Sequence, residues 1–410
     1  MQALLGIGFC ITVLWLLSES RTTIRWRAVL VGLAMQLALA FVLLNVQQIS
    51  EVLLLANQVV YAIESATFAG TNFVFGYVGG GAAPFDVQVE SALYIFAFRV
   101  LPQILVFSVL VAVFWYWRIL PAVIRALGAV LQRTLGVGGA VGTAAASSMF
   151  LGMVESPLVI RAYLQQVSRS ELFTVMTCGM ATVAGTMMIL YANVLKDVMP
   201  GALGHVLAAS AINVIGAVVL SRVWIPATRT TAGDNAEESL SYSSNMDAIT
   251  RGTADGLRLA VNVGAMLIVL VSLVALVNQL FTLVSVADAP LTLQRLMGWV
   301  FAPIAWLIGI PWAEAQAAGA LLGSKLILNE LVAFLELAGL SDGMLSPSSR
   351  LVMVYTLCGF ANFGSLGIML GGLTTLVPEK RSELLENAPK ALICGTIVNL
   401  NTGAAVALVT

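Results

Sequence analysis

The sequence predicts an all-α polytopic membrane protein with about eight transmembrane helices and two re-entrant helical hairpins. Hydrophobic residues make up 59% of the 410 residues and charged residues only 10%, whereas roughly a quarter of a soluble protein is charged. Apolar runs recur at nearly the length that crosses a bilayer. A third observation is a motif that occurs twice, each time inside an apolar run that glycine and polar residues interrupt.

Eight apolar runs predict the spans, and the first is short enough to need tilt or local thinning of the bilayer. Residues 49–68 are apolar but carry Glu51 and Glu64, which predicts an interfacial helix, and the glycines at 79–81 predict a loop. Proline, glycine and acids interrupt residues 144–164 and 299–337 in a way that a lipid-facing span would not tolerate, so these predict the hairpins. The eight runs are residues 4–17, 28–46, 92–117, 172–195, 206–223, 259–280, 351–376 and 391–409.

Loop charge predicts the orientation. Arginine and lysine gather in alternate loops, which the positive-inside rule makes cytoplasmic, so we expect both termini outside a cytoplasmic (inner) membrane. The apolar N-terminus has no basic segment before it and no cleavage site after it, so it predicts a span rather than a secretory signal. The basic residues are Arg21, Arg25, Arg27, Arg118, Arg125, Arg133, Arg222, Arg229, Arg251, Lys380, Arg381 and Lys390.

Composition argues against several classes of function. A net charge of −1 without a basic tail gives no reason to expect a nucleic-acid partner. The four cysteines lack ligand-like spacing, so we expect neither a disulfide framework nor a metal site. The only histidine, His205, has no neighbouring ligand or HExxH pattern, which makes an intramembrane enzyme a remote alternative. A channel for small polar solutes is the other alternative, because broken helices also line pores.

The repeated motif consists of the octapeptides that begin at Cys178 and Cys358, and each follows a glutamate, Glu155 and Glu330 respectively. The first hairpin leaves from a basic loop and the second from the opposite side, so the copies form inverted repeats. The polar residues 226–250 separate them and predict a cytoplasmic linker. Such repeats with intramembrane acids are typical of transporters, with the site near the bilayer midplane.

Polar side chains within the predicted spans are the candidates for chemistry. A carboxylate in hydrocarbon costs roughly 2.5 kcal/mol or more, so Glu155 and Glu330 predict a polar cavity or protonation. Thr182, Asn362 and Ser365 lie beside glycines, where unwound backbone forms ion and solute sites, although hydrogen bonding between helices is the alternative.

The cations Arg99, Arg161 and Lys325 are candidate partners for the two acids, so structural salt bridges are also open. A third acid, Glu314, lies in the second hairpin and leaves a structural and a functional role equally open.

Longer stretches closely resemble the concentrative nucleoside transporters over nearly the whole chain. The matching stretches are Gly-φ-φ-Glu-Ser-Pro-Leu-Val-Ile-Arg at 152–161, Ser-Glu-Leu-Phe-Thr-Val-Met at 170–176, and residues 262–268, 329–333, 358–362, 70–76 and 96–102. The resemblance implies a homotrimer in which a transport domain moves like an elevator against a trimerisation scaffold. It places scaffold helices and the interfacial helix at 1–120 and a scaffold helix at 251–285. The transport-domain repeats then occupy 121–225 and 286–410.

The resemblance also implies site residues. Glu330, Asn362 and Ser365 match the positions that hold the ribose hydroxyls, and Phe360 and Met187 match positions that line the pocket. The family usually meets the base with Gln-Thr-Glu on the first hairpin. This chain has Met153, Val154 and Glu155 there, so it lacks two hydrogen-bonding groups for the base.

The coupling ion is the last expectation. The positions that hold sodium in sodium-coupled relatives match Ser148, Leu151, Thr182 and Val183, so sodium is possible there. Ser148 replaces an asparagine and shortens the reach of the key oxygen, whereas a hard cation needs a nearly complete oxygen shell. We therefore expect a nucleoside symporter without an organic cofactor, coupled to protons through Glu155 in preference to sodium.

Overall fold

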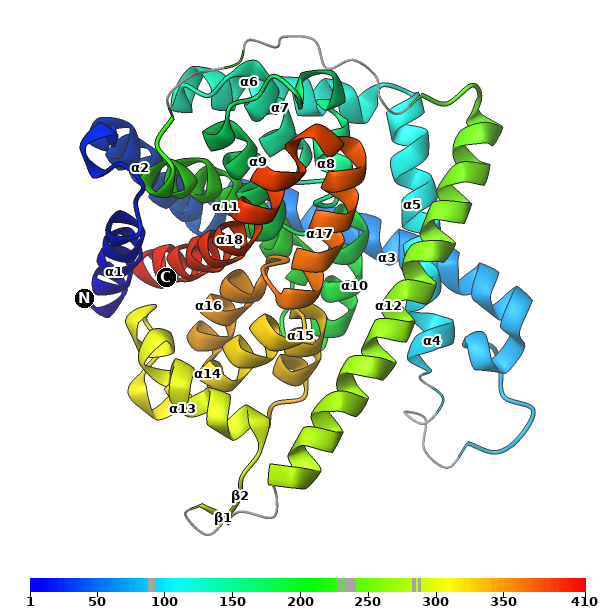
Figure 1. Cartoon of the computed structure of the whole chain (residues 1–410). Helices are drawn as coiled ribbons and strands as arrows, with labels where there is room; N and C mark the ends of the chain where they lie inside the picture. The colour runs from blue at the N-terminus through cyan, green and yellow to red at the C-terminus, as the bar shows by residue number, and fades with distance from the viewer. Residues whose placement is uncertain are drawn as a thin grey trace.

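The structure is a computed structural model that describes residues 1–87, 93, 95–227, 231, 241–281, 285–286, 289–341 and 343–410. Its architecture is helical throughout, apart from the short antiparallel pair β1 (Ser285–Val286) and β2 (Ala289–Pro290). Figure 1 shows the helices in chain order and the two termini on the same side of the molecule. Residues 228–230 and 232–240 of the predicted linker, including Arg229, lie outside the described residues.

The first half of the chain contains eleven of the described α-helices. They are α1 (Gln2–Leu16), α2 (Trp26–Asn45), α3 (Gln47–Phe75), α4 (Phe96–Arg99), α5 (Leu101–Tyr116), α6 (Ile119–Leu135), α7 (Gly139–Ser147), α8 (Glu155–Leu158), α9 (Arg169–Ala181), α10 (Gly185–Leu195) and α11 (Ala202–Trp224). Short 3₁₀ turns lie at Arg21–Thr23, Gly76–Gly79 and Arg161–Tyr163.

The second half begins with the longest helix of the described chain, α12 (Asn245–Phe281). It is followed by α13 (Leu293–Leu307), α14 (Trp312–Ile327), α15 (Glu330–Ala338), α16 (Pro347–Leu357), α17 (Phe363–Leu376), a 3₁₀ turn at Pro378–Lys380 and α18 (Arg381–Val409). Figure 1 shows α12 as a long diagonal beside α5.

The polytopic membrane architecture predicted from the apolar runs is confirmed. Among the described residues six helices are long and apolar enough to cross a bilayer, and the bent pair α13–α14 is a seventh candidate. The other two predicted runs correspond to shorter helices, α1 and the interrupted pair α16–α17. The runs at 172–195 and 351–376 are broken at the repeated motif, as the glycine and polar residues there indicated.

Three boundaries differ from the prediction. Residues 119–135 form helix α6, although Arg125 and Arg133 pointed to a loop; Ile124, Leu131 and Leu135 bury its apolar face. The interfacial helix predicted at 49–68 is the longer α3. Helix α13 precedes the second hairpin and bends by 117° into α14, so the hairpin proper is α14–α15.

Burial separates an inner group of helices from an outer group. Helices α9–α10, α11 and α18 are largely buried within the chain, whereas most residues of α2, α5 and α12 are half-buried or exposed. Glycine allows α5 and α12 to approach closely, because a Cβ at Gly252 would lie only 2.9 Å from the Val109 Cα. The outer helices therefore present apolar side chains outward, as lipid contact requires.

An ionic cluster fastens the loop after α1 to the inner helices. The Glu19 carboxylate accepts from Arg169 Nη1 at 2.6 Å and from Lys390 Nζ at 2.8 Å, and Arg169 also pairs with Glu386 at 2.6 Å. Partial burial would raise the pKa of Glu19, but the hydrogen bonds and charges of the two cations outweigh it and lower the pKa. The cluster joins α9 and α18 to the loop between α1 and α2.

Candidate functional site

The breaks in the two repeated helices lie against each other. The first break, between α9 and α10, presents the Thr182 carbonyl, which accepts from the Phe360 backbone N–H of the second break at 3.1 Å. The Asn399 side chain of α18 donates to Ala181 O at 2.8 Å and to Cys358 O at 3.1 Å. Carbonyl groups that the breaks release from helical hydrogen bonds thus find partners on other elements, which a membrane interior requires.

At the tip of the second hairpin, a buried carboxylate joins three elements. Asn329 caps α15 by accepting from Val332 N at 2.9 Å, which starts the helix at Glu330. The Glu330 side chain is 3% exposed; its Oε2 accepts from Asn362 Nδ2 at 2.9 Å and its Oε1 accepts from the Tyr191 hydroxyl at 2.5 Å. The cluster therefore links α15, α10 and the second break.

Asn362 also sets the start of α17. Its Oδ1 accepts from Ser365 N at 2.7 Å, so one amide both caps a helix and holds the Glu330 carboxylate. The structure thereby brings together Glu330, Asn362 and Ser365, the three residues predicted to hold ribose. Phe360 and Met187 are also buried, at 8% and 7% exposure.

Sequence reasoning did not find Tyr191. It lies in α10 among apolar residues, fully buried, with its ring 4.8 Å from that of Phe334. A tyrosine within a span is most often a packing residue or an interface anchor. The available signal was its hydroxyl: once buried in the middle of a span, it needs a hydrogen-bond partner.

Lys325 does not pair with an acid in the described chain. Its buried ammonium donates to Thr356 O at 2.8 Å and to Asn399 Oδ1 at 2.7 Å. The ammonium thus joins the second hairpin to α16, just before the break, and to α18. Of the other two cations, Arg161 is exposed, and no ion pair joins it to Glu155 within the described ranges.

The first hairpin is closed by hydroxyl groups. The Ser156 hydroxyl of α8 donates to Ala144 O of α7 at 2.6 Å and lies 3.0 Å from the Ser147 hydroxyl. The hairpin tip meets the first break where Phe150 O accepts from Gly185 N at 2.9 Å. This contact places the four residues predicted to hold an ion on two adjoining segments, with Ser148 and Leu151 on the tip and Thr182 and Val183 on the break.

The hydroxyls of that set are turned toward their own helices. Ser148 Oγ donates to Ala145 O at 2.8 Å, and Thr182 Oγ1 donates to Cys178 O at 2.8 Å. All four residues are buried. Each hydroxyl oxygen keeps lone pairs that can accept a hydrogen bond or contact a cation.

Glu155 differs from Glu330 in its surroundings. Its side chain is exposed, and in the described part of the chain its carboxylate makes no ion pair. The neighbouring Met153 and Val154 pack on other helices. The Met153 Cβ lies 3.0 Å from where a Cβ of Gly179 would stand, and the Val154 methyls fill the space beside Gly372 of α17. Both apolar residues thus brace the acid against α9 and α17.

Glu314 has a local structural partner. Its Oε2 accepts from the backbone N–H and from the hydroxyl of Ser346, both at 3.1 Å. Ser346 caps α16. This contact ties the start of α14 to the start of α16 and favours the structural role for this acid.

Models of one transporter family match most of the chain. Residues 5–78 match the Na+ dependent nucleoside transporter N-terminus, residues 97–197 match a nucleoside recognition domain called Gate, and residues 205–407 match the Na+ dependent nucleoside transporter C-terminus.

Curated relatives and solved structures agree with these models. The uncharacterized transporter YutK of Bacillus subtilis is 36% identical over 98% of this chain and 97% of its own. The nucleoside permease NupC of Helicobacter pylori is 32% identical over 97% and 94%. The structure of CNTnw in an inward-facing substrate-bound state superposes with a TM-score of 0.92 at 34% identity, covering 100% of this chain and 97% of that one. This protein is therefore a transporter rather than an enzyme, and it belongs to the concentrative nucleoside transporter family.

Proposed function

We propose that this chain is a secondary active symporter that carries nucleosides into the cytoplasm together with a cation, with the proton favoured over sodium. The observation that carries the proposal is the buried cluster of Glu330, Asn362 and Tyr191 between the second hairpin and the second break. A carboxylate and an amide together offer the acceptors and donors that a pair of vicinal hydroxyls needs. Ribose carries such a pair, and the nucleoside permease NupC is a relative at 32% identity.

The first hairpin offers few hydrogen-bonding groups for recognition of the base. Met153 and Val154 offer apolar contact only, and Glu155 is left as the polar group of the first hairpin. Strong discrimination needs polar groups that reject an unpaired partner. We therefore expect purine and pyrimidine nucleosides to compete within about a factor of ten of each other.

Proton coupling is supported by the first hairpin. The Ser148 hydroxyl is short and donates to its own helix, which suits a full sodium shell poorly. Glu155 has exposed surface, its carboxylate lies beside Gly152, and it has no cationic partner in the described chain, so it is the group that could take up a proton with each cycle. Sodium is the second candidate, because the matching family models are described as Na+ dependent and the Sodium/nucleoside cotransporter 1 of Sus scrofa is 31% identical over 96% of this chain and 62% of its own.

The domain organisation follows the same proposal. Residues 121–225 and 286–410 would move as an elevator-type transport domain, and 1–120 with 251–285 would form the scaffold of a homotrimer. An exposed aromatic surface on α3 and the turn after it, including Phe73 and Tyr77, supports contacts between scaffold copies. The protein would lie in the cytoplasmic (inner) membrane with both termini outside. Native mass spectrometry in detergent tests the trimer.

Uptake into proteoliposomes tests the coupling. The expected result is accumulation of radiolabelled uridine or adenosine that rises as external pH falls, collapses with a protonophore and persists when choline replaces sodium. Uptake that requires sodium and follows its gradient at constant pH would contradict proton coupling and return the ion to Thr182 and the carbonyls of Leu151 and Val183. Equilibration without accumulation would favour a channel.

A further inference from the structure

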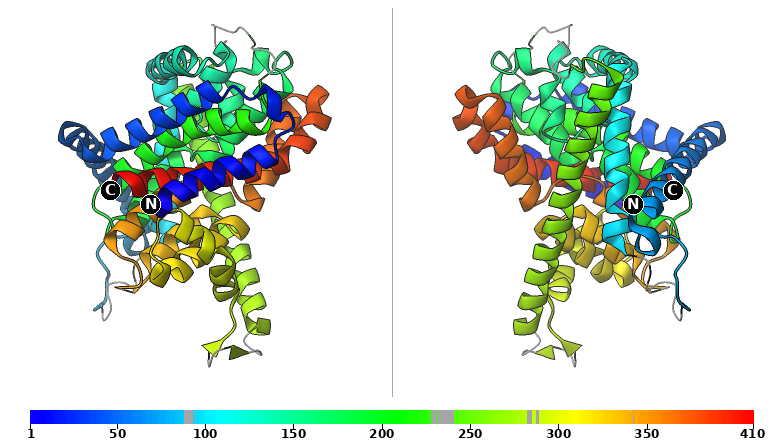
Figure 2. Two further views of the ribbon diagram at one scale, coloured as in Figure 1. Left: turned by 90° about the vertical axis from the view of Figure 1, so that its left-hand side faces the viewer. Right: turned by 90° about the vertical axis from the view of Figure 1, so that its right-hand side faces the viewer.

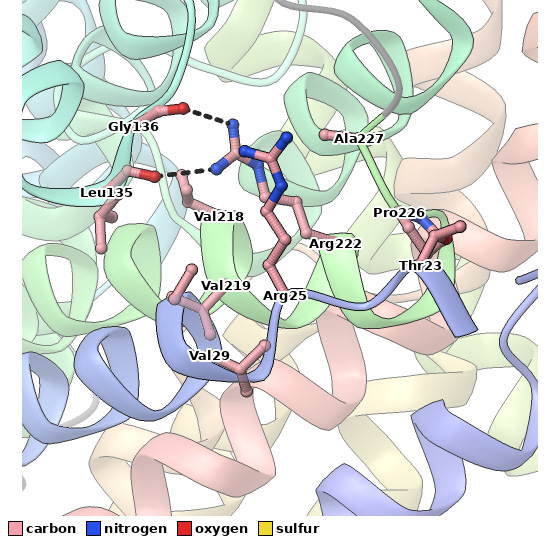
Figure 3. A pocket seen from close by; sticks show the side chains of 11 residues that line it. Thr23, Arg25, Val29, Leu135, Gly136, Val218, Val219, Arg222, Pro226 and Ala227 are labelled. Atoms are coloured by element: carbon pink, nitrogen blue, oxygen red, sulfur yellow. Dashed lines mark hydrogen bonds between the residues drawn. The ribbon is translucent and has the colours of Figure 1, made fainter. Parts of the chain in front are cut away.

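A cavity of about 180 Å³ lies away from the two breaks, among the start of α2, the end of α6 and the end of α11. Two arginines extend into it; their guanidinium groups overlap in the view of Figure 3, and their charges interact. The lining consists of Thr23, Arg25, Ala28, Val29, Leu135, Gly136, Val218, Val219, Arg222, Pro226 and Ala227.

The two guanidinium groups differ in how they are held. Arg222 donates from Nη1 to Leu135 O at 2.9 Å and from Nη2 to Gly136 O at 3.3 Å, which fixes it against the last carbonyls of α6. Arg25 lies just before the first residue of α2, and its side chain makes no capping bond to that helix. A guanidinium carries five N–H donors, so both groups keep donors for a further partner.

The charge of this cavity is not balanced by its lining. No carboxylate is among the described residues that line it. Glu171, outside the lining, accepts from the Thr231 backbone at 2.7 Å and from the Ser168 hydroxyl at 3.0 Å, and its negative charge offsets part of the charge of Arg222. The N-terminus of α2 adds positive potential beside Arg25, whereas the C-terminal ends of α6 and α11 add negative potential, so the positive charge of the cavity comes from the two guanidinium groups. Their mutual repulsion is partly screened by water, because Arg25 is exposed, and an anion between them would relieve the rest.

We propose that this cavity binds a phosphate group, held by Arg25 and Arg222. Paired guanidinium groups match the oxygens of a phosphate with charge-assisted hydrogen bonds, which are stronger than neutral ones. The cavity lies at the ends of helices with the length and apolarity of membrane spans. An acidic phospholipid headgroup is therefore the source that the position favours, and free inorganic phosphate is the other source of the same chemistry.

The bound phosphate would join three elements that are distant in sequence. Arg25 belongs to the segment before α2, whereas Arg222 and the α6 carbonyls belong to residues 121–225, which we propose to move. A ligand between them would hold α2 to α6 and α11. None of these residues belongs to the proposed nucleoside site, so binding of the phosphate can be measured without a transport assay.

The test uses the purified full chain in a detergent and zwitterionic-lipid mixture, with thermal unfolding followed as ligand is added. One arm adds phosphatidylglycerol, and the other adds inorganic phosphate at constant ionic strength. The variants are Arg25→Gln, which removes one guanidinium, Arg25→Lys, which keeps the charge, and the control Arg27→Gln. Arg27 is exposed, two residues away and not part of the lining, so the control matches the change in net charge.

We expect phosphatidylglycerol to raise the unfolding temperature of the wild type, and Arg25→Gln to weaken its apparent affinity about tenfold through the loss of charge-assisted bonds. Arg27→Gln should change that affinity by less than about twofold, and Arg25→Lys should fall between, because lysine lacks the planar fork. An equal response to inorganic phosphate would keep the site and identify free phosphate as the ligand. Identical responses of Arg25→Gln and the wild type in both arms would overturn the proposal.

Discussion

The two copies of the repeated motif differ in how the polar side chains within and beside them find hydrogen-bond partners. In the second copy two buried charged side chains have partners on other elements: Glu330 is held by Tyr191 and Asn362, and Lys325 by Thr356 O and Asn399. In the first copy the hydroxyls of Ser148 and Thr182 turn back to their own helices, and Glu155 is exposed.

This difference predicts that the second copy is the more rigid of the two and that the first copy can rearrange more easily. A satisfied buried network holds one geometry, because each partner that is removed leaves another group unpaired. Under the proposed function the second copy would be preorganised to hold a sugar, whereas the first copy would keep polar groups available for exchange with water, an ion or a base.

Removing the carboxylate of the second copy should have the largest effect. Glu330→Ala leaves both the Tyr191 hydroxyl and the Asn362 amide unpaired, and we expect nucleoside uptake to fall by about a hundredfold. The measurement is the initial rate of nucleoside uptake under a saturating gradient of the coupling ion. A thermal unfolding scan shows whether the variant is folded. Glu336→Gln is the matched control, because Glu336 lies on the same helix α15 and bonds to Gln294 at 3.4 Å. Wild-type uptake by Glu330→Ala would refute the site.

The acid of the first copy should control coupling rather than binding. Glu155→Gln keeps the shape of the side chain but cannot carry a proton, so we expect facilitated exchange of nucleoside to persist while accumulation driven by a pH gradient is lost. Counterflow and gradient-driven uptake in the same proteoliposomes separate the two activities.

The ion itself is tested in the opposite direction by Ser148→Asn, which restores an amide oxygen to the set with Thr182 and should introduce sodium-dependent uptake. Accumulation by Glu155→Gln at the wild-type level would show that the first copy is not the coupling site.

Lys325 tests whether the second copy is held rigid by its internal cation. Lys325→Met is similar in size but leaves the Thr356 carbonyl and the Asn399 amide oxygen without their donor. Each such buried group costs about 1–3 kcal/mol, so we expect a fall of several degrees in the unfolding temperature. Arg350→Gln, at a partly exposed position on α16, serves as the comparison for loss of one positive charge. An unchanged unfolding temperature for Lys325→Met would contradict the assignment.

Base recognition should respond to polarity on the first hairpin. Met153→Gln and Val154→Thr together add hydrogen-bonding groups beside Glu155, and we expect the ratio of purine to pyrimidine competition to change by about tenfold or less. The measurement is inhibition of labelled uridine uptake by unlabelled nucleosides. Both side chains pack on neighbouring helices, so an unchanged ratio would mean that they brace the hairpin and do not meet the base.

Breaking the ionic cluster around Glu19 should have the smallest effect. It should concern both copies, because the cluster joins α9 to α18. The lowered pKa of Glu19 means that its stabilising contribution is complete above the pKa of the unfolded chain and is lost as pH falls through the lower native value. The side chains are partly exposed, so Glu19→Gln should cost less than about 1 kcal/mol at neutral pH. Unfolding temperatures of wild type and Glu19→Gln should converge under acid conditions; a constant difference would contradict the assignment.

Much of the helical framework followed from apolar runs, because a lipid environment permits few alternatives for the backbone. The broken spans were predictable from glycine and polar residues within those runs. Helix α6 was not predicted, because its arginines were interpreted as those of a basic loop. Glu330, Asn362 and Ser365 were predicted as polar residues within broken spans, and the resemblance to a family added the expected ribose role. Lys325 was expected as a partner of an acid but donates to Thr356 O and Asn399 instead, and Tyr191 and Asn399 were not predicted. Their partners come from distant parts of the chain, and only the packing of helices brings them together.

One side chain described above restricts which residues its neighbourhood can hold. Asn399 accepts from Lys325 with its oxygen and gives both N–H groups to the carbonyls of Ala181 and Cys358. Aspartate has the same shape but no donors, and leucine has neither donors nor an acceptor. The amide also occupies the space where a side chain at Gly359 would begin. Asn399 on α18 and Gly359 in the break between α16 and α17 therefore constrain each other, because a side chain at position 359 would meet both the Asn399 amide and the Ala181 carbonyl.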